Sequence, residues 1–176
     1  NDILNKADAI VQLGLMNDDK ISLLKNNQTI IGILNPYTNE DKLKQLVQKN
    51  INVFSLELLP RITRAQSMDI LSSQANLAGY KAVLESFAYF GKAIPMMMTA
   101  AGTIPAAKVL IVGAGVAGLQ AIATAKRMGA IVFATDVRMA SKEQVESLGG
   151  KFLTVEGAEN LETEGGYAKE ATDDFK

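Results

Sequence analysis

Apolar runs alternate with amphipathic segments along the first third of the chain. The runs at residues 9–15, 29–34 and 51–56 have the length and the aliphatic content of buried strands. Between them, residues 18–26 and a segment that Asn39 can cap space their apolar side chains as helices do. This β-α-β-α-β order favours a parallel sheet covered by helices, because parallel neighbours need a crossover connection.

A long helix and an interrupted stretch separate this pattern from a second one of the same kind. The helix is expected to run to Phe90 after a cap at Ser67 or Asp69, and Pro95 and Pro105 break the stretch that follows. Beyond them the pattern predicts strands and helices in turn, at residues 108–112, 116–128, 131–135, 141–148 and 152–155.

The two patterns predict an α/β fold with two Rossmann-like parallel-sheet domains. We place an N-terminal α/β domain at residues 1–71 and a nucleotide-binding Rossmann domain at residues 72–176. Asn1 is an unusual first residue, and the chain stops inside a segment with helical spacing. We therefore expect both domains to be incomplete in this fragment, and the fragment alone to bind a nucleotide weakly or not at all.

Composition narrows the possible chemistry. The net charge of −1 offers no basic surface for nucleic acid. The chain contains neither cysteine nor histidine, so no metal site is expected, and any general acid or base would have to be Asp, Glu, Lys or Tyr. No apolar run reaches the about 18 residues that a membrane span requires.

The second pattern contains a glycine fingerprint between its first strand and its first helix. Gly113 permits a tight turn, Gly115 lets the backbone approach a pyrophosphate, and Gly118 lets the helix pack closely on the sheet. Val116 opens the helix, whose N-terminus favours phosphate. Asp136 follows near the separation of about 20 residues that is usual for a ribose ligand. The pattern therefore predicts NAD(H) in preference to NADP(H).

Two residues of this region have a second interpretation. A role as a turn or helix-capping residue is the less favoured alternative for Asp136. Arg138 is a candidate cofactor contact toward a 2′-phosphate, although a solvent-exposed surface charge is the more ordinary role for such an arginine.

Longer strings of residues are more specific than the glycine motif. They lie at residues 61–69, 72–80, 98–103, 134–138 and 142–152. These strings resemble the NAD(H)-binding domain, on the alpha subunit, of proton-translocating NAD(P) transhydrogenases, in the superfamily that also contains the alanine dehydrogenases. The resemblance is dense from Pro60 to Phe152 and weaker over residues 1–59.

The resemblance implies an enzyme and its partners. In this family the NAD(H)-binding domain passes a hydride directly to NADP+ held on a separate NADP(H)-binding domain, and a membrane proton-channel domain couples the transfer to proton movement. The resemblance further implies a homodimer, peripheral to the cytoplasmic side of the bacterial inner membrane.

The resemblance also assigns roles to residues outside the fingerprint. It implies that Arg61, Gln66 and Asp69 form a catalytic loop at the nicotinamide end, with Ser72 as a neighbouring contact and Tyr167 on a mobile loop that closes over the nucleotide. From the residues alone, Arg61 would be a surface charge, Gln66 and Asp69 helix caps, and Tyr167 a packing aromatic.

Two other functions remain open. An alanine dehydrogenase-like oxidoreductase would need a substrate-binding lysine and a catalytic histidine. The alanine dehydrogenases have these residues at the positions matched here by Gln12 and Asn35. Neither side chain supplies a charge, and this favours direct hydride transfer, which needs no proton transfer at the reacting carbons. Transhydrogenases also often keep the lysine, so Gln12 departs from both groups. A non-catalytic NAD-binding regulatory module is the third possibility.

Overall fold

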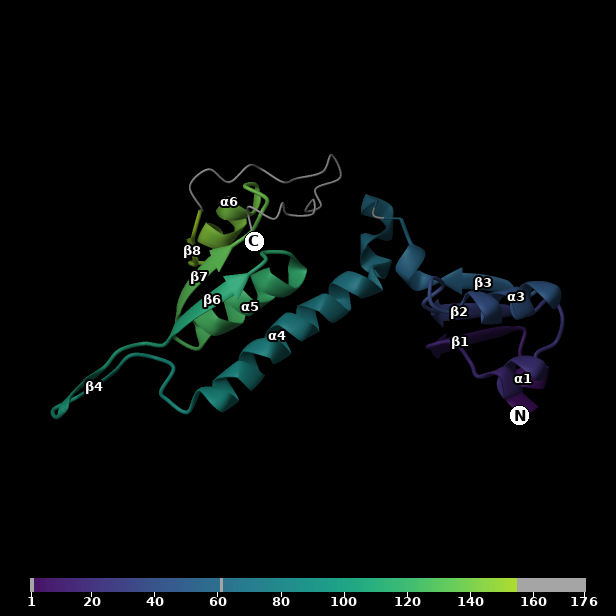
Figure 1. The fold of residues 1–176 in the computed structure, drawn as a ribbon, viewed down its shortest axis with the longest axis horizontal. Helices are drawn as coiled ribbons and strands as arrows, with labels where there is room; N and C mark the ends of the chain where they lie inside the picture. Colours follow the sequence, from purple (N-terminus) through teal and green to yellow (C-terminus); the bar gives the residue numbers. More distant parts are fainter. Residues whose placement is uncertain (1, 61, 155–176) are drawn as a thin grey trace. The chain divides into compact units, whose positions relative to one another are not determined.

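The computed structural model describes residues 2–60 and 62–154. It divides into two compact units, Asn1–Leu71 and Ser72–Lys176, which are described separately below. Both units are α/β and contain a parallel sheet, as the sequence predicts (Figure 1).

The first unit contains a parallel three-stranded sheet in the order β1-β2-β3. Gln12 of β1 is level with Gly32 of β2, which is level with Ser55 of β3. Helices α2 and α3 connect the strands. The elements are α1 (Asp2–Lys6), β1 (Ala9–Leu13), α2 (Asp18–Ser22), β2 (Thr29–Ile33), α3 (Glu40–Gln48), β3 (Asn52–Ser55), and the 3-10 turns η1 (Leu56–Leu58) and η2 (Thr63–Met68).

A small apolar core holds this unit together. Ile30 and Leu34 from the central strand and its end pack with Ile21 of α2 and Leu46 of α3, and all four are fully buried. Alternate residues of each strand face this core, because successive side chains of a strand point to opposite faces. The predicted helix and strand order of the first pattern is thus confirmed.

The helix predicted over residues 18–26 ends earlier, at Ser22. Lys49, which follows α3, extends its ammonium group to the carbonyl oxygens of Ile21, Ser22 and Leu24 at 3.0, 2.6 and 3.0 Å. The ammonium group therefore supplies hydrogen bonds to carbonyls at the end of the helix, where the Ile21 carbonyl also accepts the backbone N–H of Leu24. This tertiary contact is not visible in the local spacing of the sequence.

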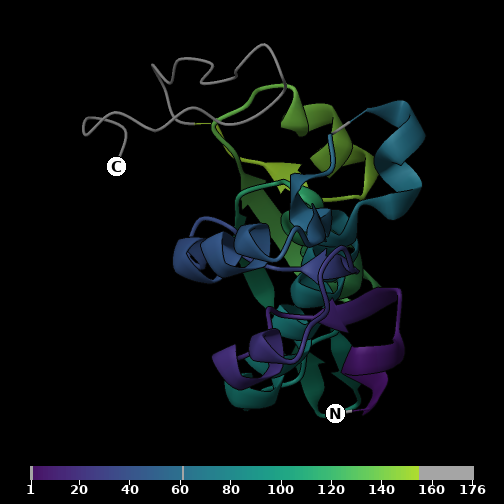
Figure 2. The ribbon, with the colours of Figure 1, turned by 90° about the vertical axis from the view of Figure 1, so that its right-hand side faces the viewer.

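The second unit repeats the parallel arrangement in the order β6-β7-β8. Its elements are α4 (Ile70–Phe90, whose first two residues belong to the first unit), β4 (Met97–Thr99), β5 (Gly102–Ile104), β6 (Lys108–Val112), α5 (Val116–Arg127), β7 (Ile131–Thr135), α6 (Ser141–Ser147) and β8 (Lys151–Phe152). Helices α5 and α6 pack against the strands of this sheet (Figure 1). Figure 2 shows the same ribbon turned by 90°.

The core of the second unit lies between the sheet and its helices. Val132 and Ala134 of β7 are buried against Ile122 of α5 and Val145 of α6. Gly79 of α4 lies so close to α5 that a Cβ there would be 2.0 Å from the carbonyl oxygen of Ala117. Helix α4 therefore packs backbone to backbone on the first turn of α5.

An antiparallel hairpin of β4 and β5 interrupts this α/β pattern. The sequence predicts only an apolar stretch broken by prolines here, so the hairpin is an element that the hydrophobic pattern misses. Among the described residues, no helix combines the length and the apolar character needed to cross a bilayer.

Candidate functional site

The glycine fingerprint forms the turn between β6 and α5. Gly113 has φ +92°, a backbone conformation that side chains disfavour, and its N–H donates to the Thr135 carbonyl of β7 at 2.8 Å. Gly118 is required for packing, because a Cβ there would lie 1.8 Å from the Gly113 carbonyl oxygen. The predicted turn and helix-packing roles of these two glycines are what the geometry shows.

Gly115 occupies the N-cap position of α5 and presents an open backbone surface. A Cβ at this position would meet nothing closer than 3.9 Å, and that nearest atom is Nη2 of Arg138. Helix α5 begins at the next residue, Val116, which is 39% exposed. The first N–H groups of this twelve-residue helix have no partner within the helix, so they suit an anion such as a phosphate.

The Asp136 carboxylate joins the end of β7 to this loop. Its Oδ2 accepts a hydrogen bond from the Ala114 backbone N–H at 2.6 Å. Its Oδ1 accepts the backbone N–H of Arg138 at 2.8 Å, which closes a local turn. The side chain of Asp136 is only 5% exposed. Asp136 therefore positions the loop in addition to any contact with a nucleotide.

Arg138 forms a bidentate ion pair with the same carboxylate. Its Nε donates to Oδ1 of Asp136 and its Nη2 donates to Oδ2, both at 2.9 Å. The Arg138 side chain is 21% exposed. The interpretation of Arg138 as a solvated surface charge is therefore wrong, because its charge is engaged by a nearly buried carboxylate.

The protonation state of Asp136 follows from these contacts. Burial by itself raises the pKa of Asp136, but the side-chain and backbone hydrogen bonds from Arg138, the Ala114 N–H and the arginine charge lower it, so that the pKa lies below its ordinary value. The carboxylate is accordingly charged at neutral pH.

The residues assigned to the nicotinamide end lie in a different stretch of the chain. Gln66 is exposed on η2, and its carbonyl oxygen accepts the backbone N–H of Asp69 at 3.2 Å. Ser72 lies in the first turn of α4 and is half-buried. Arg61 and Tyr167 lie outside the described residues. The structure thus brings together the fingerprint, Asp136 and Arg138, while Gln66 and Asp69 belong to the first unit.

The carboxyl edge of the first sheet contains a carboxylate as well. Oε1 of Glu57 accepts the backbone N–H of Leu34 at 2.8 Å and also that of Asn35, whose φ is +47°. Burial raises the pKa of Glu57, whereas hydrogen bonds from backbone N–H groups lower it below its ordinary value. Sequence reasoning missed this carboxylate, and its position two residues after β3 is the signal that was available.

The positions matched to the alanine dehydrogenase lysine and histidine lie at this edge. Gln12 lies near the end of β1 and has a buried side-chain nitrogen for which the described residues offer no hydrogen-bond partner. Asn35 is held by Glu57 through its backbone. The charged group described among these residues is thus an anion, Glu57, rather than a cation.

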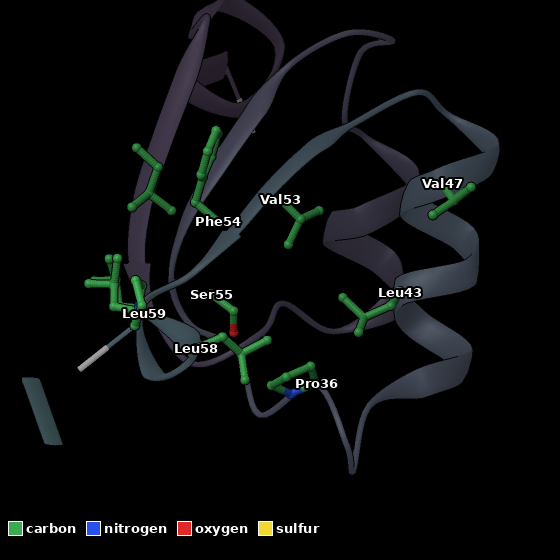
Figure 3. A pocket seen from close by; sticks show the side chains of 11 residues that line it. Pro36, Leu43, Val47, Val53, Phe54, Ser55, Leu58 and Leu59 are labelled. Carbon is green, nitrogen blue, oxygen red and sulfur yellow. The ribbon is translucent and has the colours of Figure 1, made fainter. Parts of the chain in front are cut away.

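A second concave feature lies in the first unit, between β3 and α3. Figure 3 shows Val53 and Ser55 of β3 facing Leu43 and Val47 of α3. The cavity has a volume of about 670 Å³ and an almost entirely apolar lining. Its described lining contains no charged side chain, whereas a dinucleotide phosphate is held by charges and by backbone N–H groups.

Comparisons with known protein families agree with the division into two parts. Residues 1–78 match the family described as the alanine dehydrogenase/PNT N-terminal domain, and residues 82–172 match the alanine dehydrogenase/PNT C-terminal domain.

Curated relatives carry transhydrogenase names. The chain is 58% identical over 160 residues, 90% of this chain and 42% of the relative, to the first part of NAD(P) transhydrogenase subunit alpha of Rhodospirillum rubrum. It is 52% identical over 179 residues to the protein of the same name from Rickettsia prowazekii, covering 99% of this chain and 47% of the relative. The chain spans about half the length of these relatives.

Solved structures show the same similarity. A transhydrogenase from Sinorhizobium meliloti superposes with a TM-score of 0.83 at 54% identity, over 88% of this chain and 45% of that one. An L-alanine dehydrogenase superposes with a TM-score of 0.69 at 19% identity, over 85% of this chain and 42% of that one, which is a similarity of fold.

Proposed function

The chain belongs to the alanine dehydrogenase/PNT family, and from this membership we propose that it is the NAD(H)-binding part of the alpha subunit of a proton-translocating NAD(P) transhydrogenase. Its partners are an NADP(H)-binding domain and a membrane proton-channel domain of the same complex. The assembly contains a homodimer of this domain, on the cytoplasmic side of the bacterial inner membrane.

The observation that carries the proposal is the geometry around Gly115. Three features meet at the loop between β6 and α5. They are the open backbone surface at Gly115, the N-terminus of α5, and the ionised carboxylate of Asp136, which accepts the Ala114 N–H of this loop. The first two suit a pyrophosphate, and the carboxylate suits the hydroxyl groups of the adenosine ribose. Gly113, Gly115, Val116 and Gly118 would hold the phosphates, and Asp136 with Arg138 would face the ribose.

Electrostatics at the first sheet favours hydride transfer over amino-acid oxidation. An alanine dehydrogenase must hold the carboxylate of its substrate and move a proton. Gln12 and Asn35 are uncharged, and the nearby Glu57 is a carboxylate with a lowered pKa. A substrate carboxylate would be repelled there rather than bound.

In this proposal the residues at the nicotinamide end position rings and transfer no protons. Bound NADH would supply the hydride. Gln66 and Asp69, with Arg61 and Ser72 beside them in sequence, orient the dihydronicotinamide toward the partner domain, and Tyr167 closes over it. Positioning of this kind affects the rate, because small misplacement costs more in the transition state than in the ground state.

A stopped-flow measurement of hydride transfer, between NADH on this protein and an oxidised NADP analogue on the partner domain, tests the proposal. Gln66→Asn should slow the transfer at least about tenfold with little change in NADH affinity. Gln45→Asn, the same change on the exposed surface of α3, is the matched control and should have no effect. The rate should vary little between about pH 6 and 8, because no group that titrates there takes part.

The alternatives predict other results. An unchanged rate in Gln66→Asn would remove this residue from the site, and a steep bell-shaped pH profile would count against direct transfer. Reduction of NAD+ by alanine without any partner domain would establish the dehydrogenase. Tight NADH binding with no hydride transfer to the partner domain would identify a regulatory module.

A further inference from the structure

We propose that Arg138 sets the nucleotide selectivity of the glycine-loop site: it competes with the adenosine ribose for Asp136 and offers a cation to a 2′-phosphate. This inference rests on the proposed function, since it concerns the same site. It adds that the site contains one group that rejects a 2′-phosphate and one that accepts it.

The Asp136 carboxylate is saturated with hydrogen bonds. A carboxylate accepts about four hydrogen bonds, and four are in place, from the Ala114 N–H and from the backbone, Nε and Nη2 nitrogens of Arg138. A ribose hydroxyl can reach this carboxylate only by displacing donors. Those of the guanidinium are the ones that can leave, because the two backbone N–H groups are fixed by the turn.

The guanidinium of Arg138 lies close to the glycine loop. Nη2 of Arg138 is the atom nearest to the open face of Gly115, 3.9 Å from the place of a Cβ. The cation therefore lies between the carboxylate that would meet the ribose and the backbone that would meet the phosphates. A phosphate on the ribose 2′-oxygen would arrive beside it.

The ion pair also changes the charge that a 2′-phosphate would meet at this site. With the guanidinium in place, the carboxylate is neutralised by a bidentate partner, so a 2′-phosphate meets a compensated pair instead of a bare negative charge. The planar guanidinium also matches a phosphate with two parallel hydrogen bonds. Arg138 thus weakens the preference for NADH that Asp136 alone would give.

Arg138→Gln tests the guanidinium separately from the backbone turn. The backbone N–H of residue 138 still donates to Oδ1 of Asp136 in this variant, so the loop keeps that support. Arg138→Lys keeps the charge but loses the two-pronged donor. Arg127→Gln, at the exposed last residue of α5, removes the same charge elsewhere in the same unit and is the matched control.

The experiment measures dissociation constants for NADH and NADPH by fluorescence, and for 5′-AMP and 2′,5′-ADP by calorimetry. The second pair differs only in the 2′-phosphate. In Arg138→Gln the ratio of the 2′,5′-ADP to the 5′-AMP dissociation constant should rise at least about tenfold, with tighter 5′-AMP and weaker 2′,5′-ADP. Arg138→Lys should fall between, and Arg127→Gln should leave the ratio unchanged.

Each other outcome has a definite meaning. If the unmodified protein binds these nucleotides but the ratio stays constant in Arg138→Gln, the inference is overturned and the proposed function stands. An equal rise in Arg127→Gln would assign the effect to net charge and also overturn it. If the unmodified protein with its complete domain binds none of the four ligands, the proposed function fails and the inference falls with it.

Discussion

The two parallel sheets of this chain have the same strand order, yet their carboxyl edges differ in chemistry. In each, an acidic side chain accepts backbone N–H groups from the loop after the neighbouring strand: Glu57 from Leu34 and Asn35, and Asp136 from Ala114. After β6 the chain enters a helix within a few residues of the strand, and Arg138 pairs with the carboxylate. After β2 a longer loop with a proline intervenes before α3.

This contrast shows that the same topology can place a carboxylate at the carboxyl edge of each sheet without determining the function of that carboxylate. Glu57 accepts the backbone N–H groups of Leu34 and of uncharged Asn35 and works as an internal acceptor. Asp136 does the same for Ala114 and in addition lies next to an open glycine and a cation. Function follows from these added groups rather than from the fold.

A substitution at Gly115 should have the largest effect, because it should impair nucleotide binding by the glycine loop without destabilising the sheet. Gly115→Val should weaken NADH binding at least about a hundredfold with little loss of stability, because its methyl groups would occupy the phosphate position. A Cβ at this residue would meet no protein atom closer than 3.9 Å. Nucleotide titration and urea unfolding of the same preparation measure both quantities.

Whereas Gly115→Val should mainly reduce NADH binding, Gly118→Ala, in the same loop, should mainly reduce stability. Its Cβ would be 1.8 Å from the Gly113 carbonyl oxygen, so the variant should lose stability before it loses any ligand contact. Undiminished NADH binding by Gly115→Val would place the phosphates elsewhere.

Removal of each carboxylate in turn should have an intermediate effect. Glu57→Ala leaves the N–H of Leu34, whose residue is fully buried, without its acceptor and should cost about 1–3 kcal/mol of unfolding free energy. The preference of the Glu57→Ala variant for NADH over NADPH should not change. Asp136→Ala should narrow that preference, because the repulsion of a 2′-phosphate is lost. A change of selectivity in Glu57→Ala would contradict the separate roles of the two carboxylates.

The dependence of stability on acid should be the weakest effect. Asp136 and Glu57 have pKa values lowered by folding, so each contributes stability that is complete above its ordinary pKa of about 4 and is lost as the pH falls through the lower folded value. Thermal unfolding between about pH 2 and 6, a range that spans the ordinary carboxyl pKa, should show a decline that Asp136→Asn and Glu57→Gln each make shallower. Equal slopes in all three proteins would contradict both assignments.

Much of the second unit is predictable because local and tertiary signals agree there. The strands Lys108–Val112 and Ile131–Thr135 have the predicted bounds, and α5 differs from its prediction only at its last residue. Continuous apolar runs beside a glycine turn leave few alternatives. The fingerprint and Asp136 come from the same signals.

The remaining features depend on contacts that no local pattern contains. Helix α6 has Ala140 at its N-cap position, although the next residue, Ser141, is a usual capping residue; Ser141 is already helical and buried. The hairpin of β4 and β5 has strands too short for a periodic signal. The ion pair of Arg138 was indicated only by its place two residues after Asp136, and the fold of the turn is what brings the two side chains together.

The close contact between Gly79 and Ala117 restricts which mutations the protein can tolerate. Residue 79 belongs to no binding motif, and yet any side chain there would collide with the backbone at the start of α5. Among random variants screened for nucleotide binding, glycine would therefore be retained at position 79 as strictly as at position 118. A map of intolerant positions would extend the apparent binding site onto α4, where the constraint is one of space between two helices.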